Sequence, residues 1–157
     1  MTFEARDPDF EHRVRASFER QAAMRLFGVT MERVTPGTVE LSLSYRADLT
    51  QQHGFLHAGV AAAVVDSACG YAALSLMEPG VAVLSVEFKV QLLAPARGAW
   101  FRARGEVVRA GRTLSVVSGE LHAFAKARDD ADAEEGEVVT LLTGTMMTVR
   151  GRPELVD

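Results

Sequence analysis

The chain has 157 residues, of which 48% are apolar and 24% charged, and its formal net charge at pH 7 is −4. This length and composition predict a single globular domain over residues 1–157, and the negative balance argues against a nucleic-acid partner, whose phosphates would select a basic face. The one cysteine excludes an intrachain disulfide and is typical of a reducing, cytoplasmic compartment. No secretory signal is expected, because the charged start of the chain lacks an apolar core.

A helix is the first predicted element. Asp7 and Pro8 form a typical helix start, with an N-cap residue followed by a proline. Apolar side chains then recur every four residues to about Met24, which predicts an amphipathic helix, and Gly28 ends this part of the chain. Residues 1–27 are therefore expected to form an N-terminal helix region.

Most of the remaining chain predicts strands. Apolar and polar residues alternate in 39–45 and 83–93, and turn residues separate these runs from other strand-like segments. The predicted strands are residues 29–34, 39–45, 83–93, 99–108, 113–125 and 138–149. The acidic stretch 129–137 between the last two is expected to be a solvated loop, and the tail 150–157 to be frayed.

Residues 58–77 form a long apolar run, nearly half of it alanine or glycine. Its length approaches that of a membrane span, but a central Asp66 and the lack of basic flanks or an aromatic belt favour a helix buried inside the protein, with no membrane partner. The loop 47–57 leads into it. A curved antiparallel sheet wrapped around this helix would cover it, so the predicted fold class is α+β.

Asp66 is the only carboxylate in this run. Its neighbours one helical turn away are Ala62, Ala63, Cys69 and Gly70, so no basic residue of the same element can neutralise it. An unpaired buried carboxylate is unfavourable or has a raised pKa, and such groups concentrate at working sites. Asp66 is therefore the main functional candidate, whereas Cys69 is expected to belong to the core.

The segment from Gln51 to Asp66 resembles the signature of the phenylacetate-pathway (PaaI-like) hotdog-fold thioesterases. That signature contains Gly-x-Leu-His-Gly-Gly and, seven residues after the second of those glycines, a helical Asp or Glu; Gly54-Phe-Leu-His-Ala-Gly59 and Asp66 match its spacing. Residues 84–96 resemble the family's next strand and its proline-containing turn, and the resemblance covers a core of about 28–149. It implies a hotdog fold and hydrolysis of acyl-coenzyme A thioesters by a homodimer or tetramer.

The resemblance also implies roles for single residues. Asp66 would be the nucleophile or the base that activates water, and the backbone N–H of Ala58 would polarise the thioester carbonyl. Gln51 would position water or the thioester, and Ser85 would support the carboxylate, although strand alternation leaves open whether Ser85 faces water. Ala58 stands where the family has glycine, so its methyl group would crowd the thioester. The four histidines show no metal-ligand spacing, so no metal is expected, and no cofactor beyond the coenzyme A of the substrate.

Five further candidates have open alternatives. His57 would either donate to a substrate carbonyl or cap the loop. Gly59 would either bind the substrate or serve backbone approach and helix packing, the favoured interpretation. Arg109 and Arg112 flank a tight turn where Gly111 would let a phosphate of coenzyme A approach, or they form a solvated hairpin.

Helix geometry adds a constraint. Ala58 and Asp66 are eight residues apart in the sequence, which corresponds to about 12 Å along a helix. One thioester carbonyl cannot contact both in the same chain, so the sequence predicts an obligate dimer with composite sites. The alternatives are a non-catalytic acyl-CoA-binding protein and, less favoured, a hydratase or dehydratase of the same fold, whose Asp-x-Asn-Pro-x-His pattern is absent from the sequence.

Overall fold

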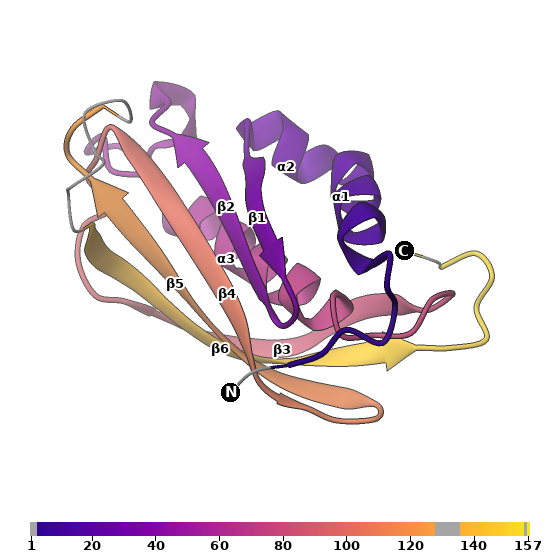
Figure 1. Cartoon of the computed structure of the whole chain (residues 1–157). Helices are drawn as coiled ribbons and strands as arrows, with labels where there is room; N and C mark the ends of the chain where they lie inside the picture. The colour runs from indigo at the N-terminus through magenta and orange to yellow at the C-terminus, as the bar shows by residue number, and fades with distance from the viewer. Residues whose placement is uncertain (1–2, 128–135, 156) are drawn as a thin grey trace.

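The computed structural model describes residues 3–127, 136–155 and 157, and shows a six-stranded antiparallel sheet curved around one helix (Figure 1). The strand order is β1-β2-β4-β5-β6-β3. The strands are β1 Thr30–Thr35, β2 Thr38–Ser44, β3 Ala82–Leu92, β4 Trp100–Ala110, β5 Leu114–Phe124 and β6 Glu137–Val149. The central helix α3 spans Ala58–Leu74, after a short 3-10 turn at Ala47–Leu49. This confirms the predicted α+β hotdog fold.

The helix α3 is buried because the sheet meets its backbone closely. Val64, Val65, Ala68 and Cys69 have no exposed surface, and strands β2 to β6 all contact the helix. Burial and the nearby Asp66 charge raise the pKa of the Cys69 thiol to about 12. Cys69 therefore belongs to the core, as expected.

Within residues 3–127 and 136–155, no helix has both the length and the apolar character needed to cross a membrane.

The N-terminal helix differs from the prediction in where it starts. Helix α1 spans Phe10–Arg20, so it begins after Pro8. The Asp7 carboxylate accepts hydrogen bonds from the Asp9 N–H and from Arg13 Nε, both at 2.9 Å, so it shapes the preceding turn rather than capping the helix. Arg13 also donates to the carbonyl oxygen of Met77 at 2.7 Å, just beyond the end of α3.

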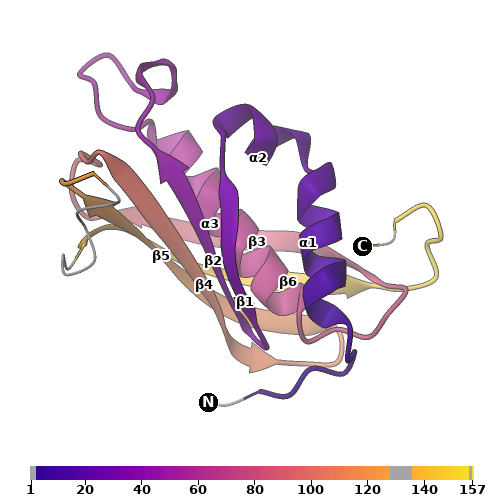
Figure 2. The same ribbon diagram turned by 45° about the horizontal axis from the view of Figure 1, so that its top comes forward.

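The N-terminal helix region also contains two helices, although the sequence predicted a single helix to about Met24. Gln21 is extended, with φ −76° and ψ 96°, and separates α1 from α2, which spans Ala22–Phe27. Gly28 adopts a positive φ of 74° and ends α2, as expected. Helix α1 lies against β1 and α3 (Figure 2).

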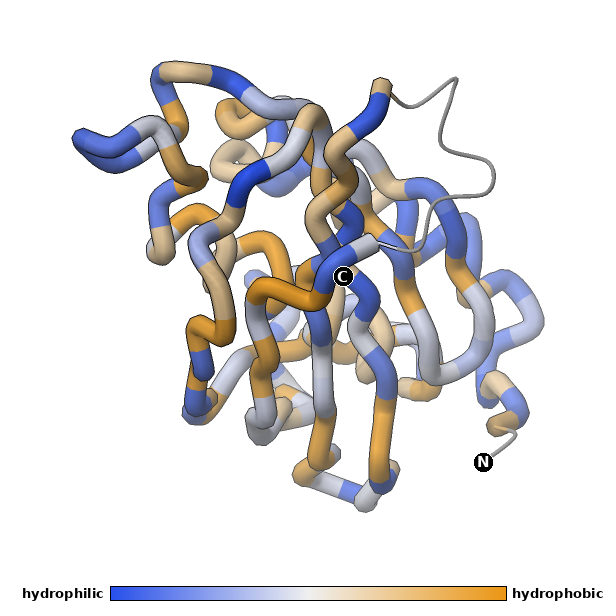
Figure 3. Tube along the Cα trace, turned by 90° about the vertical axis from the view of Figure 1, so that its left-hand side faces the viewer, coloured by the Kyte–Doolittle hydropathy of each residue, from blue (hydrophilic) through white to orange (hydrophobic). Residues whose placement is uncertain are grey.

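Apolar and polar residues alternate along the strands (Figure 3), which agrees with the period of two in the sequence. The end of the chain, however, is not frayed throughout. Asp157 Oδ2 accepts a hydrogen bond from the Val83 N–H at 2.9 Å, and its Oδ1 accepts one from Ser17 Oγ at 2.7 Å. These contacts hold the end of the tail between α1 and β3. Of the predicted acidic loop 129–137, residues 129–135 lie outside the described part of the chain.

Candidate active site

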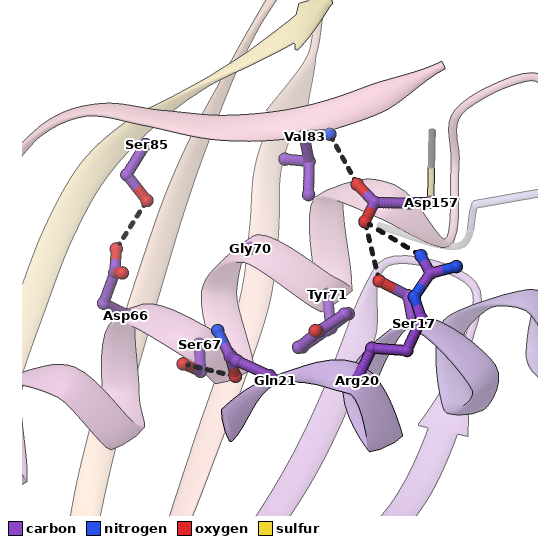
Figure 4. A pocket seen from close by; sticks show the side chains of 10 residues that line it. All are labelled: Ser17, Arg20, Gln21, Asp66, Ser67, Gly70, Tyr71, Val83, Ser85 and Asp157. Carbon is purple, nitrogen blue, oxygen red and sulfur yellow. Dashed lines mark hydrogen bonds and ion pairs between the residues drawn. The ribbon is translucent and has the colours of Figure 1, made fainter. Parts of the chain in front are cut away.

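Asp66 lies on the face of α3 that is turned toward strand β3 (Figure 4). Its Oδ1 accepts a hydrogen bond of 2.8 Å from Ser85 Oγ. Burial raises the pKa of the Asp66 carboxyl above its ordinary value, and the hydrogen bond from Ser85 offsets part of that rise. No cation pairs with Asp66 in the ranges that the structure describes. The site therefore contains a half-buried carboxylate, held by one hydroxyl and poised to take up a proton.

A β-bulge decides the position of Ser85. In the pairing of β3 with β6, Ser85 lies opposite Met146 and Glu87 lies opposite Thr145, so Val86 is an extra residue. The extra residue shifts the alternation by one position. Ser85 therefore shares the α3 side of the sheet with the buried Met146, although strict alternation would have grouped it with Glu87.

The first turn of α3 leaves one backbone donor free. His57 is the N-cap, and its Nδ1 accepts a hydrogen bond of 2.9 Å from the Gly59 N–H. The carbonyl oxygen of His57 accepts from the N–H groups of Val60 and Ala61. The Ala58 N–H has no acceptor in the described part of the chain. A Cβ on Gly59 would lie 3.1 Å from the imidazole, so a larger residue here would crowd the cap.

Replacing His57 separates its two possible roles. His57→Ala removes the cap and is expected to lower the free energy of unfolding by about 1 kcal/mol, whereas His57→Asn restores an N-cap and most of that loss. We expect both variants to retain wild-type turnover once folded. Denaturant titration measures the free energy of unfolding, and a thioesterase assay measures the turnover. A loss of turnover shared by both variants would instead assign the Nε2–H group, which neither retains, to catalysis.

Gln51 lies in the loop before α3. Its Oε1 accepts a hydrogen bond from the His53 N–H, which leaves the amide NH₂ group available as a donor. Gln51 and Ala58 line one hollow, together with Leu92 of β3, whereas Asp66 and Ser85 line another. Within one chain, Asp66 and Ser85 therefore lie together in one hollow, and Gln51 and Ala58 lie together in another.

The turn between β4 and β5, with Arg109, Gly111 and Arg112, lines neither of these two hollows. Gly111 and Arg112 line a third hollow with Arg150. A Cβ on Gly111 would overlap the carbonyl oxygen of Leu114, so the tightness of the β4–β5 turn accounts for this glycine. A role for Arg109 and Arg112 toward phosphates remains a prediction.

The Asp66 pocket also contains polar residues that the sequence did not single out: Ser17, Gln21, Ser67, Tyr71 and Asp157. They come from α1, the break after it, α3 and the end of the chain. Ser17 and Gln21 were not recognised in the sequence, because they lie in a segment whose apolar periodicity predicts an ordinary amphipathic helix. Within the described residues, no cluster of three or more His, Cys, Asp or Glu side chains could hold a metal ion.

Comparison with known proteins gives consistent matches. Residues 53–125 match the family model of the thioesterase superfamily. A candidate esterase of Halobacterium salinarum is 36% identical over 120 residues, which cover 73% of this chain and 77% of that protein. The crystal structure of a thioesterase family protein from Silicibacter pomeroyi is 48% identical, covers 90% of this chain and 99% of its own, and superposes with a TM-score of 0.84. The PaaI protein of the phenylacetic acid degradation operon of E. coli, at 19% identity, has the same fold, with a TM-score of 0.77 over 91% of this chain and 95% of its own.

Proposed function

The chain belongs to the thioesterase superfamily and is a thioester hydrolase, and we propose that it cleaves acyl-coenzyme A to the free acid and coenzyme A. In this proposal Asp66 is the general base or the nucleophile, and the N–H of the partner subunit's Ala58 polarises the carbonyl. The observation that carries the proposal is the Asp66 carboxylate itself, which is half-buried, supported by Ser85 and not paired with any cation in the described ranges.

The chemistry of thioester hydrolysis fits the two halves of the site. A carboxylate whose pKa is raised by burial is a better base toward water than one in bulk solvent. The carbonyl oxygen gains negative charge during attack, and a helix N-terminus stabilises such charge through its free N–H groups. In α3 the free group of this kind is the Ala58 N–H, because the cap occupies that of Gly59 and the His57 carbonyl occupies those of Val60 and Ala61.

Two features support a dimer with composite sites. Asp66 and Ala58 open into separate hollows of one chain, so neither hollow holds a complete site. Strand β3 is at the edge of the sheet and exposes Leu84, Val86, Phe88 and Leu92. A long apolar edge strand is a template for pairing with another chain. Pairing β3 with its copy across a two-fold axis would oppose the two α3 helices, with the start of one near Asp66 of the other.

A complementation experiment tests this arrangement. Ala58→Pro removes the N–H at the first helical position, where proline is well tolerated, and Asp66→Asn removes the carboxylate in the other half. Each variant alone is expected to lack turnover of acyl-CoA. Coexpressing the two should restore about a quarter of wild-type activity, because half of random dimers are mixed and each mixed dimer has one intact site of two.

The control is a chain that carries both changes, coexpressed with wild type. Composite sites predict about a quarter of wild-type activity there too, because only wild-type homodimers keep intact sites. Sites within one chain predict no activity in the first mixture and about half in the second. Mixed dimers that form in the first mixture and remain inactive would contradict the composite site.

A further inference from the structure

The Asp66 pocket continues beyond the carboxylate into a small chamber (Figure 4). Its volume is about 300 Å³, at the lower end of the range of about 300 to 1,000 Å³ found for small-molecule sites. Because it begins at Asp66 and Ser85, it is the natural place for the acyl group of a thioester held there. Its size favours a small acyl group over a long chain.

A backbone break brings Gln21 into this chamber. Gln21 is extended between α1 and α2, although glutamine is a good helix former. Its Oε1 accepts a hydrogen bond of 3.3 Å from Ser67 Oγ, the residue after Asp66. Figure 4 shows the amide nitrogen turned away from Ser67. That NH₂ group has no acceptor in the part of the chain that the structure covers, so it offers its hydrogen atoms to a ligand in the chamber.

The charges around the chamber disfavour an anionic acyl group. The Asp157 carboxylate accepts from Ser17 Oγ and the Val83 N–H, and it lies 3.8 Å from Arg20 Nη2. Arg20, the one arginine among the described residues that line the chamber, therefore already has a carboxylate partner. Asp66 would repel a second anion. Burial raises the pKa of the Tyr71 phenol, which keeps it neutral. Among the described residues that line it, the chamber is thus polar and offers no free cation.

We propose that Gln21 is a specificity-determining residue, whose carboxamide donates a hydrogen bond to an uncharged hydroxyl or ketone oxygen on a small acyl group. This inference rests on the proposed acyl-CoA hydrolysis. Ser67 positions the carboxamide by holding its oxygen, and the extended backbone at Gln21 directs the side chain toward α3. An acyl group without such an oxygen would cover the NH₂ group without accepting its hydrogen bond. The donor would then be shielded from water and unsatisfied, which costs transition-state stabilisation.

Three four-carbon thioesters test the inference, because they differ in polarity at similar size: butanoyl-CoA, its ketone analogue oxobutanoyl-CoA and succinyl-CoA. We expect the wild type to have a kcat/KM for the ketone about tenfold above that for butanoyl-CoA, and to turn over succinyl-CoA most slowly. Gln21→Leu should abolish that tenfold preference by lowering the ketone value while leaving the butanoyl value nearly unchanged.

Two further variants complete the design. Gln21→Glu keeps an oxygen for Ser67 and lacks the NH₂ donor, so it should lose the ketone preference even if the leucine variant folds poorly. Gln52→Leu makes the same change at an exposed glutamine outside the chamber and should keep the preference. Turnover with the same preference in all variants, or a wild type that favours succinyl-CoA, would overturn the role of Gln21. A wild type that cleaves no acyl-CoA would instead overturn the proposed function.

Discussion

Replacing Asp66 by asparagine is expected to lower the turnover of acyl-CoA at least about a hundredfold, because the change removes the proposed base or nucleophile. The substitution is nearly isosteric, and the asparagine oxygen can still accept the hydrogen bond from Ser85. Thiol release from a panel of acyl-CoAs measures the effect, with wild type assayed beside the variant. A variant that keeps a tenth or more of wild-type turnover would contradict the role of Asp66.

The pH dependence gives a second measure of the same residue. Burial raises the pKa of Asp66 above its ordinary 3.8, so wild-type activity should fall as pH falls through the raised pKa and the carboxyl takes up a proton. Stability should change in the opposite direction. The folded protein binds this proton more tightly than the unfolded chain, so the contribution to stability is full below 3.8 and is lost as pH rises through the raised pKa.

Asp66→Asn should therefore melt at a higher temperature than wild type at neutral pH, and this advantage should shrink in acid as the wild-type carboxyl becomes neutral. The comparison separates catalysis from folding, since a misfolded variant would lose both activity and stability. A variant that is less stable than wild type at neutral pH would mean that the carboxylate supports the fold, contrary to its lack of a cation partner in the described residues.

The second large effect is expected at Gly105, on strand β4 beneath the helix. A Cβ at this position would overlap the carbonyl carbon of Ala68 and lie 2.6 Å from its oxygen. Backbone cannot yield as a flexible side chain can, so the sheet and α3 would have to separate. We expect Gly105→Ala to lower the free energy of unfolding by about 3 kcal/mol, as measured by denaturant titration.

Gly70→Ala is the matched control for this substitution. Gly70 lies in α3, and a Cβ there would have no heavy atom within 4 Å. Alanine should therefore stabilise the helix by about 0.5 to 1 kcal/mol. If Gly105→Ala unfolds at the wild-type denaturant concentration, the close approach of β4 to α3 is not required for stability.

The close approach at Gly105 also bears on the site. Gly119 of β5 pairs with Gly105, and a Cβ on Gly119 would lie 2.6 Å from a methyl carbon of Val65. Both glycines lie under the same helix and let the sheet approach Val65 and Ala68, which precede and follow Asp66 in the sequence. This packing holds α3 against β4 and β5, while Asp66 of the same helix contacts Ser85 of β3.

The sequence by itself determined the elements and their order. Alternation of period two in 39–45 and 83–93, with strand-like runs between turn residues elsewhere, predicted the six strands. The apolar run with its single carboxylate predicted the buried helix and Asp66 as its anomalous residue. These signals are local, because side-chain periodicity depends only on the geometry of one element. The spacing of Ala58 and Asp66 also predicted that one chain would separate the two halves, since helix rise is constant, and the structure places them in separate hollows.

Only the tertiary structure decided how side chains of distant segments meet at the site. The bulge at Val86 turns Ser85 toward Asp66, the break at Gln21 directs a carboxamide to Ser67, and the chain end at Asp157 lies beside Val83. None of these leaves a periodic signal, because each depends on contacts between residues far apart in the sequence. A bulge, a helix break or a docked tail forms where those contacts outweigh local preference.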